Sequence, residues 1–167
     1  MKNQRGITLF TAVVITSMLL FICFAMISIA TKGTIFASTG RDSQYAYYAS
    51  EAGIECAVYW DSKFDPSKFA TSTSGSSISC AGYTITTGST SYGTTTTTLV
   101  GGGGTNATST FSFLMDKGDN PTNSCAVVTV SKYYVGSSLK TYIKSRGYNT
   151  CDMTSIRRVE RGVEVTY

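Results

Sequence analysis

Histidine is absent from this chain of 167 residues, which removes the side chain that most often serves as a general base or metal ligand near neutral pH. The serines therefore have no histidine to activate them as nucleophiles. Glu51 and Glu55 lie four residues apart, but we interpret them as a solvated helix face rather than a catalytic pair. The glycines at 101–104 lack the lysine and helix context of a phosphate-binding loop. The sequence indicates no enzyme, no catalytic residue, no cofactor and no metal site.

Charge is missing from a long N-terminal stretch, because no acidic or basic residue lies between Arg5 and Lys32. The stretch is strongly apolar, and about 20 apolar helical residues span a bilayer core. We therefore predict a transmembrane helix over 7–31. Lys2 and Arg5 precede it, which favours a cytoplasmic N-terminus and an external C-terminal part. A cleaved secretory signal has an apolar core of only about 7–15 residues, so we prefer a helix that stays in the membrane.

The helix is predicted to continue over 32–61 as an amphipathic segment, since the first proline is Pro66. One helix face carries a small-residue ridge, formed by Ala49, Gly53 and Ala57 at intervals of four. An aromatic stripe runs beside the ridge and consists of Tyr45, Tyr48, Ala52, Cys56 and Tyr59. We expect both to face the protein's own core, with contacts to other subunits as the alternative.

Three features in this order resemble the N-terminal region of type IV pilins: the junction Gly6-Ile7-Thr8-Leu9, the uncharged helix, and the segment YYASEAGIE at 47–55. The last is closest to minor pilins whose first helix ends in an (F/Y)-(Y)-A-(A/S)-E-A-G signature. The resemblance implies that a prepilin peptidase removes residues 1–6 by cleaving after Gly6 and that Ile7 becomes an N-methylated terminus. It further implies membrane lipid, other pilin subunits and an inner-membrane assembly platform as partners.

Thr11 departs from the pilin pattern. In major pilins the fifth mature residue is a glutamate that pairs with the N-terminal amine of a neighbour, and counting from Ile7 that position is Thr11. A carboxylate in lipid is costly unless it is paired, so its loss removes a strong docking interaction. We therefore expect a minor subunit, near the filament tip, whose assembly helix uses Leu9, Thr11, Ala49, Gly53 and Ala57.

This resemblance implies a precursor in the cytoplasmic membrane with its head outside, and then an extracellular filament. The expected role is pilus assembly, adhesion or DNA uptake. Two alternatives stay open. One is a minor pseudopilin of a type II secretion system, and the other is a single-pass membrane protein with an external binding head that never assembles.

Residues 62–167 are predicted to form a small β-rich head. Apolar residues alternate with a period of two over 83–87, 111–115 and 126–130, which is typical of strands. The segments 139–146 and 159–167 are expected to be antiparallel neighbours, with Lys140 and Lys144 facing Glu160 and Glu164. Arg161 interrupts the apolar side and predicts a bulge or an edge strand. The predicted fold class is α+β, with a long N-terminal helix and a C-terminal antiparallel sheet.

Four cysteines lie in the exported part, and Cys23 lies in the apolar run. An even number of cysteines outside the cytoplasm, without a C-x-x-C pair, favours two disulfides. Three pairings are possible. We favour Cys56–Cys80, joining the helix to the first strand, together with Cys125–Cys151, closing a longer loop.

Positive charge and aromatic rings are combined near the C-terminus, a combination that suits single-stranded nucleic acid or glycans. This candidate ligand patch consists of Lys132, Tyr133, Tyr134, Lys140, Tyr142, Lys144, Arg146 and Tyr148. The preferred interpretation is plainer: a tyrosine-rich outer sheet face whose charge is balanced by Glu160 and Glu164.

Overall fold

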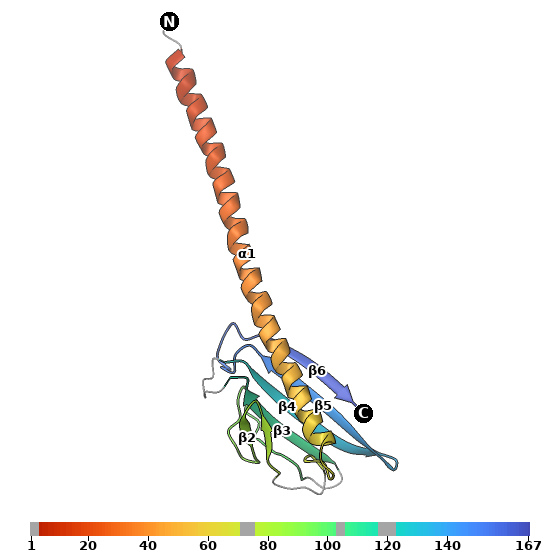
Figure 1. The fold of residues 1–167 in the computed structure, drawn as a ribbon. Coiled ribbons are helices and arrows are strands. Elements are labelled where there is room, and N and C mark those ends of the chain that lie inside the picture. Colours follow the sequence, from red (N-terminus) through yellow and green to blue (C-terminus); the bar gives the residue numbers. More distant parts are fainter. Residues whose placement is uncertain (1–3, 71–75, 103–105, 117–122) are drawn as a thin grey trace. The chain divides into compact units, whose positions relative to one another are not determined.

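The computed structural model describes residues 4–70, 76–102, 106–116 and 123–167, with side chains described from Ile7 onward. Residues 1–3 of the predicted leader lie outside the described residues. The chain divides into two compact units, Met1–Gly40 and Arg41–Tyr167. Helix α1 (Gln4–Ser62) belongs to both, and the strands that follow it are β1 (Ile78–Cys80), β2 (Tyr83–Ile85), β3 (Ala107–Leu114), β4 (Cys125–Val135), β5 (Ser138–Tyr148) and β6 (Glu160–Thr166) (Figure 1).

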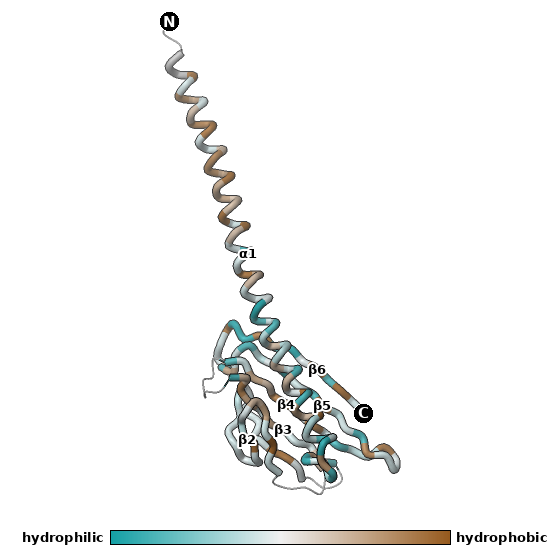
Figure 2. Tube along the Cα trace, viewed as in Figure 1, coloured by the Kyte–Doolittle hydropathy of each residue, from teal (hydrophilic) through white to brown (hydrophobic). Residues whose placement is uncertain are grey.

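The first unit is the N-terminal part of α1, and its side chains over 7–30 are mostly apolar and mostly exposed. Phe10, Phe21 and Phe24 are each 70% exposed or more, and hydrophobic residues predominate along this part of the helix in Figure 2. By length and composition the helix is able to cross a membrane. A helix satisfies its backbone hydrogen bonds internally, which a bilayer core requires. This unit is therefore compatible with a single-pass membrane anchor.

The second unit contains a four-stranded antiparallel sheet in the order β3-β4-β5-β6 and a two-stranded sheet of β1 and β2. The chain is thus α+β, with the long apolar helix and C-terminal antiparallel sheet that the sequence predicts. Strand β6 pairs only with β5 and is an edge strand, one of the two outcomes predicted from Arg161. The threonine-rich segment before β3 contributes an isolated bridge, Leu99 to Thr110.

The main core lies between residues 41–62 of α1 and one face of the large sheet, which we call the inner face. Val128, Val130 and Ile143 on that face are fully or almost fully buried, as alternation along a half-covered strand requires. Stacked Phe69 and Phe111, with ring centroids 5.8 Å apart, extend this core beside β3. Helix α1 ends at Ser62, one residue after the predicted end of the helix at Asp61. The second compact unit nevertheless begins at Arg41, because the last turns of the helix pack on the sheet.

Two glycines allow α1 to approach the sheet closely. A Cβ on Gly53 would overlap Ser145 Oγ and lie 2.9 Å from Val128 Cγ2. A Cβ on Gly147 in β5 would overlap the backbone of Ala46 and Ser50. Since neither site has room for even a methyl group, glycine is required by packing at both positions.

Candidate functional site

The predicted processing site lies at the start of α1. Gly6 is within the helix, while Ile7 is 65% exposed and Leu9 is 72% exposed. The hydroxyl of Thr11 donates to backbone carbonyls of its own helix, Ile7 O at 3.1 Å and Thr8 O at 3.0 Å. Thr16 does the same toward Ala12 O and Val13 O. Thr11 therefore adds neither a charge nor an unsatisfied hydroxyl to the apolar surface.

The ridge and the aromatic stripe have opposite environments. The ridge residues Ala49, Gly53 and Ala57 are buried against the inner face, as expected for the protein's own core. Their predicted use in assembly is wrong, because the head already covers them. The expectation that the stripe also faces the core is wrong for its tyrosines, since Tyr45 and Tyr48 are 53% and 61% exposed. It is confirmed for Cys56, which is half-buried and packs against the main core. The sheet contacts α1 along its small side chains because only these permit the close approach.

Asp61, in the last turn of α1, is the centre of a buried polar network. Lys132 Nζ lies 2.7 Å from Asp61 Oδ1, and both side chains are nearly inaccessible. The hydroxyls of Tyr167 and Thr141 donate to Asp61 Oδ2 at 2.7 and 3.3 Å, and Ser67 donates to Oδ1. Burial opposes the charge, but these hydrogen bonds outweigh it and lower the pKa of Asp61. Burial and then the Asp61 carboxylate raise the pKa of Tyr167.

The predicted ligand patch divides between the two faces of the sheet. Lys132 lies on the inner face and is only 5% exposed, so its inclusion in the patch is wrong. Tyr134 shares that parity and lies near the β4–β5 turn, where it is 52% exposed. Tyr148 is 7% exposed, with Arg158 3.8 Å above its ring. The accessible outer members are Tyr133, Lys140, Tyr142, Lys144 and Arg146.

Acidic residues of β6 partly balance the outer cations. Lys144 Nζ lies 2.7 Å from Glu164 Oε1, as predicted, whereas Glu160 lies 3.7 Å from Arg146 Nε instead of facing Lys140. The hydrogen bond between the first pair raises the pKa of Lys144 and lowers that of Glu164. Because both pairs are well exposed, they contribute little to stability and are available for exchange with other ligands.

The four cysteines form the favoured pairing, Cys56–Cys80 and Cys125–Cys151. The first bond joins α1 to β1. The second joins the start of β4 to the segment after β5, and there Leu114 and Tyr148 form a second small core on the outer face.

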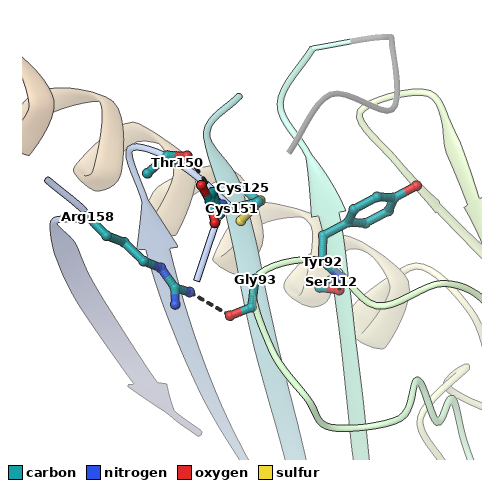
Figure 3. Close-up of a disulfide and its surroundings, with 8 residues drawn as sticks. Tyr92, Gly93, Ser112, Cys125, Thr150, Cys151 and Arg158 are labelled. Carbon is teal, nitrogen blue, oxygen red and sulfur yellow. Dashed lines mark hydrogen bonds between the residues drawn. A yellow bond between two sulfur atoms is a disulfide. The ribbon is translucent and has the colours of Figure 1, made fainter. Parts of the chain in front are cut away.

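The second disulfide region holds the segment that precedes Leu99 against the sheet (Figure 3). Arg158 donates through Nη2 to Gly93 O at 2.5 Å. The backbone N–H of Tyr92 donates to Ser112 Oγ at 2.6 Å. Gly93 has a φ of +66°, and a Cβ there would lie 2.8 Å from Cys125 Sγ. A glycine is therefore needed for both the backbone conformation and the close contact.

A polar groove of about 200 Å³ lies between this segment and the outer face. Lys144 and Arg146, two residues apart on β5, supply its positive charge. The remaining lining residues are Thr94, Thr96, Thr110, Val127 and Thr129. The sequence analysis identified the two cations but missed the threonines, although Thr94 and Thr96 alternate with the period of a strand.

The N-terminal signature and this groove are thus the candidate functional features of the two units. No protein-family model, curated protein or solved structure matches the chain.

Proposed function

We propose that this chain is a minor type IV pilin, a structural subunit stored in the cytoplasmic membrane and then assembled into a surface filament. The observation that carries the proposal is the uncharged stretch of α1 over 7–31, whose large apolar side chains are exposed in the described part of the chain. Such a surface needs lipid before assembly and neighbouring helices afterwards. The YASEAG signature and the junction at Gly6 add the resemblance to minor pilins.

Processing of the N-terminus tests the proposal. We expect the mature chain from native membranes to begin at N-methylated Ile7, and a Gly6→Val variant to keep Met1. A Gly33→Val variant is the matched control, since Gly33 lies in the same helix and a Cβ added there would have no neighbouring atom within 4 Å. Cleavage elsewhere would exclude prepilin processing. An intact Met1 in the native chain would favour the permanently anchored alternative.

Thr11 supports a position near the filament tip, because the first subunit extracted has no neighbour above it to pair with. We expect immunogold label at filament ends in the wild type. A Thr11→Glu variant restores the docking carboxylate and should spread the label along the shaft. Thr16→Glu is the control. The native Thr16 makes the same kind of backbone hydrogen bonds as Thr11, and its replacement adds an equal charge at a position that is not the docking position. Label along the whole wild-type filament would refute the tip assignment.

The filament context distinguishes this role from the alternatives. Mass spectrometry of sheared surface filaments should detect this chain together with other pilin subunits. Recovery only with a type II secretion complex would favour the pseudopilin alternative. The exposed cations of the outer sheet face, Lys140, Lys144 and Arg146, support a contribution to adhesion or DNA uptake.

A further inference from the structure

We propose that the groove formed by Thr94, Thr96 and the outer face of the sheet binds a carboxylate-bearing sugar. The role of such binding in adhesion rests on the proposed function of the chain as a pilin. All lining residues belong to the unit Arg41–Tyr167, so binding requires neither processing after Gly6 nor assembly. The binding test and the processing test can therefore fail independently.

Hydroxyl groups line both sides of the groove. Thr94 and Thr96 lie on the covering segment, and Thr110 and Thr129 lie opposite on β3 and β4. A threonine hydroxyl has one donor and two acceptor positions. Thr94 Oγ1 donates to Thr96 Oγ1 at 3.2 Å and also accepts from Thr96 N–H at 3.1 Å. The Thr96 hydroxyl accepts the first of these bonds, so its own hydrogen is available to donate to a ligand. Ligands rich in hydroxyl groups, such as sugars, need donors of this kind.

The cations of the groove define the charge of the ligand. Lys144 and Arg146 have side chains on the same side of β5, with Cα atoms roughly 7 Å apart, and none of the described residues that line the groove is acidic. An arginine guanidinium matches a carboxylate in geometry, and a lysine adds a point charge. Glu160 and Glu164 pair with these cations from β6, outside the groove lining. A ligand carboxylate would replace exposed pairs of low strength.

Size and lining favour a sugar over nucleic acid. The groove, at about 200 Å³, is smaller than the roughly 300–1,000 Å³ of pockets for drug-sized molecules, which suits a single sugar residue. Val127 provides an apolar contact for one face of the ring. Single-stranded nucleic acid is held largely by stacking on aromatic rings, and none of the described lining residues is aromatic.

The covering segment is positioned before a ligand arrives. Gly93, the residue before Thr94, is held by Arg158 and packs beside Cys125. On the other side, Ser91 Oγ and Thr98 Oγ1 lie 3.0 Å apart, and Leu99 pairs with Thr110. Since these contacts hold the segment without a ligand, little ordering is needed on binding.

Calorimetric titration of the full-length chain in detergent micelles tests the proposal, with galacturonic acid as the probe and its methyl ester as the uncharged match. We expect saturable binding of the acid, about tenfold or more tighter than binding of the ester. Arg146→Gln and Thr96→Val should each weaken acid binding. Arg146→Gln should do so by about tenfold or more, because it removes a hydrogen-bonded charge.

Two further variants separate recognition from misfolding and diffuse charge. Glu164→Gln frees Lys144 and should tighten acid binding by about twofold or more, a gain that misfolding cannot produce. Lys140→Gln removes an outer-face cation that does not line the groove, and it should leave the affinity unchanged. No saturable binding of the acid, equal binding of the ester, or equal weakening by Lys140→Gln would each overturn the proposal. Tighter binding of a short oligothymidylate with the same dependence on Arg146 would assign the groove to nucleic acid instead.

Discussion

Replacing Gly53 with alanine tests how α1 packs on the sheet. A Cβ at this position would overlap Ser145 Oγ, lie 2.9 Å from Val128 Cγ2 and lie 3.2 Å from Ala126 Cβ. All three neighbours are fully buried, so none can move into solvent. Overpacking of this kind typically costs about 1–3 kcal/mol. Alanine regains about 1 kcal/mol through its higher helix propensity, so the free energy of unfolding should fall by up to about 2 kcal/mol.

Ser145→Ala provides the second arm of a double-mutant cycle. Ser145 Oγ is buried and makes no hydrogen bond within the described part of the chain, so its removal alone should cost little. Because that oxygen is the nearest obstacle to a Cβ at Gly53, the alanine at 53 should be tolerated better when Ser145 is also alanine. We expect a coupling free energy of about 0.5 kcal/mol or more, as found for residues in direct contact.

Denaturant unfolding of the full chain in detergent measures both effects. Trp60, the only tryptophan, is a suitable fluorescent reporter because it is half-buried and donates to Ser79 O at 3.0 Å. Gly40→Ala is the matched control, since no atom lies within 4 Å of the added methyl group, and it should not destabilise the fold. Equal stability of the Gly53→Ala and Gly40→Ala variants, or a Gly53→Ala cost unaffected by Ser145→Ala, would refute this packing.

Four further predictions concern the head. Asp61→Asn should lower the free energy of unfolding by about 3–5 kcal/mol, because it leaves Lys132 charged and buried. Adding Lys132→Met should restore most of the lost stability in the same unfolding assay. Folding lowers the pKa of Asp61, so the stabilising contribution of its carboxylate is present above the unfolded pKa and is lost as the pH falls through the folded pKa. When the pH is lowered below about 4, the wild type should therefore lose more stability than the double variant does. Replacing Cys125 and Cys151 together with serine should cost about 3–4 kcal/mol for a sequence separation of 26 residues and weaken acid-sugar binding, while circular dichroism still detects α1. Gly147→Ala should be more destabilising than Gly53→Ala, because it meets backbone rather than side-chain atoms, and equal destabilisation would contradict that.

Local patterns in the sequence were sufficient to predict the main elements of the fold. The uncharged run predicts the long helix, and the alternation of Phe111 and Phe113, or of Val128 and Val130, identifies the buried parity of β3 and β4. The position of Arg161 on the otherwise apolar side of β6 agrees with an edge strand. There it donates to Ser43 Oγ on α1 at 2.8 Å.

The sequence did not predict the environment of Lys132. Its neighbours Tyr133 and Tyr134 suggest an exposed basic and aromatic surface, but strand parity places Lys132 on the inner face. Its partner Asp61 lies 71 positions earlier in the numbering, at the end of α1. Only the docking of the helix on the sheet brings the two charges together, and local periodicity contains no information about that contact.

The groove was also hidden in the sequence, for a different reason. Lys144 and Arg146 were identified by their charge, whereas Thr94 and Thr96 lie in a low-complexity segment of threonine, serine and glycine. The segment is held in place by Arg158 and Gly93, which are 65 residues apart. A polar segment of this kind becomes part of a site only through such long-range contacts.

The burial of the ridge restricts how the second unit can contact other molecules. Ala49, Gly53 and Ala57 form the side of α1 that can approach another backbone most closely, and the head's own sheet already occupies it. The side chains of α1 that remain available in this unit include the aromatic rings of Tyr45 and Tyr48, each more than half exposed. Packing through small residues therefore stabilises the head, and contacts between subunits in this unit would have to use larger side chains.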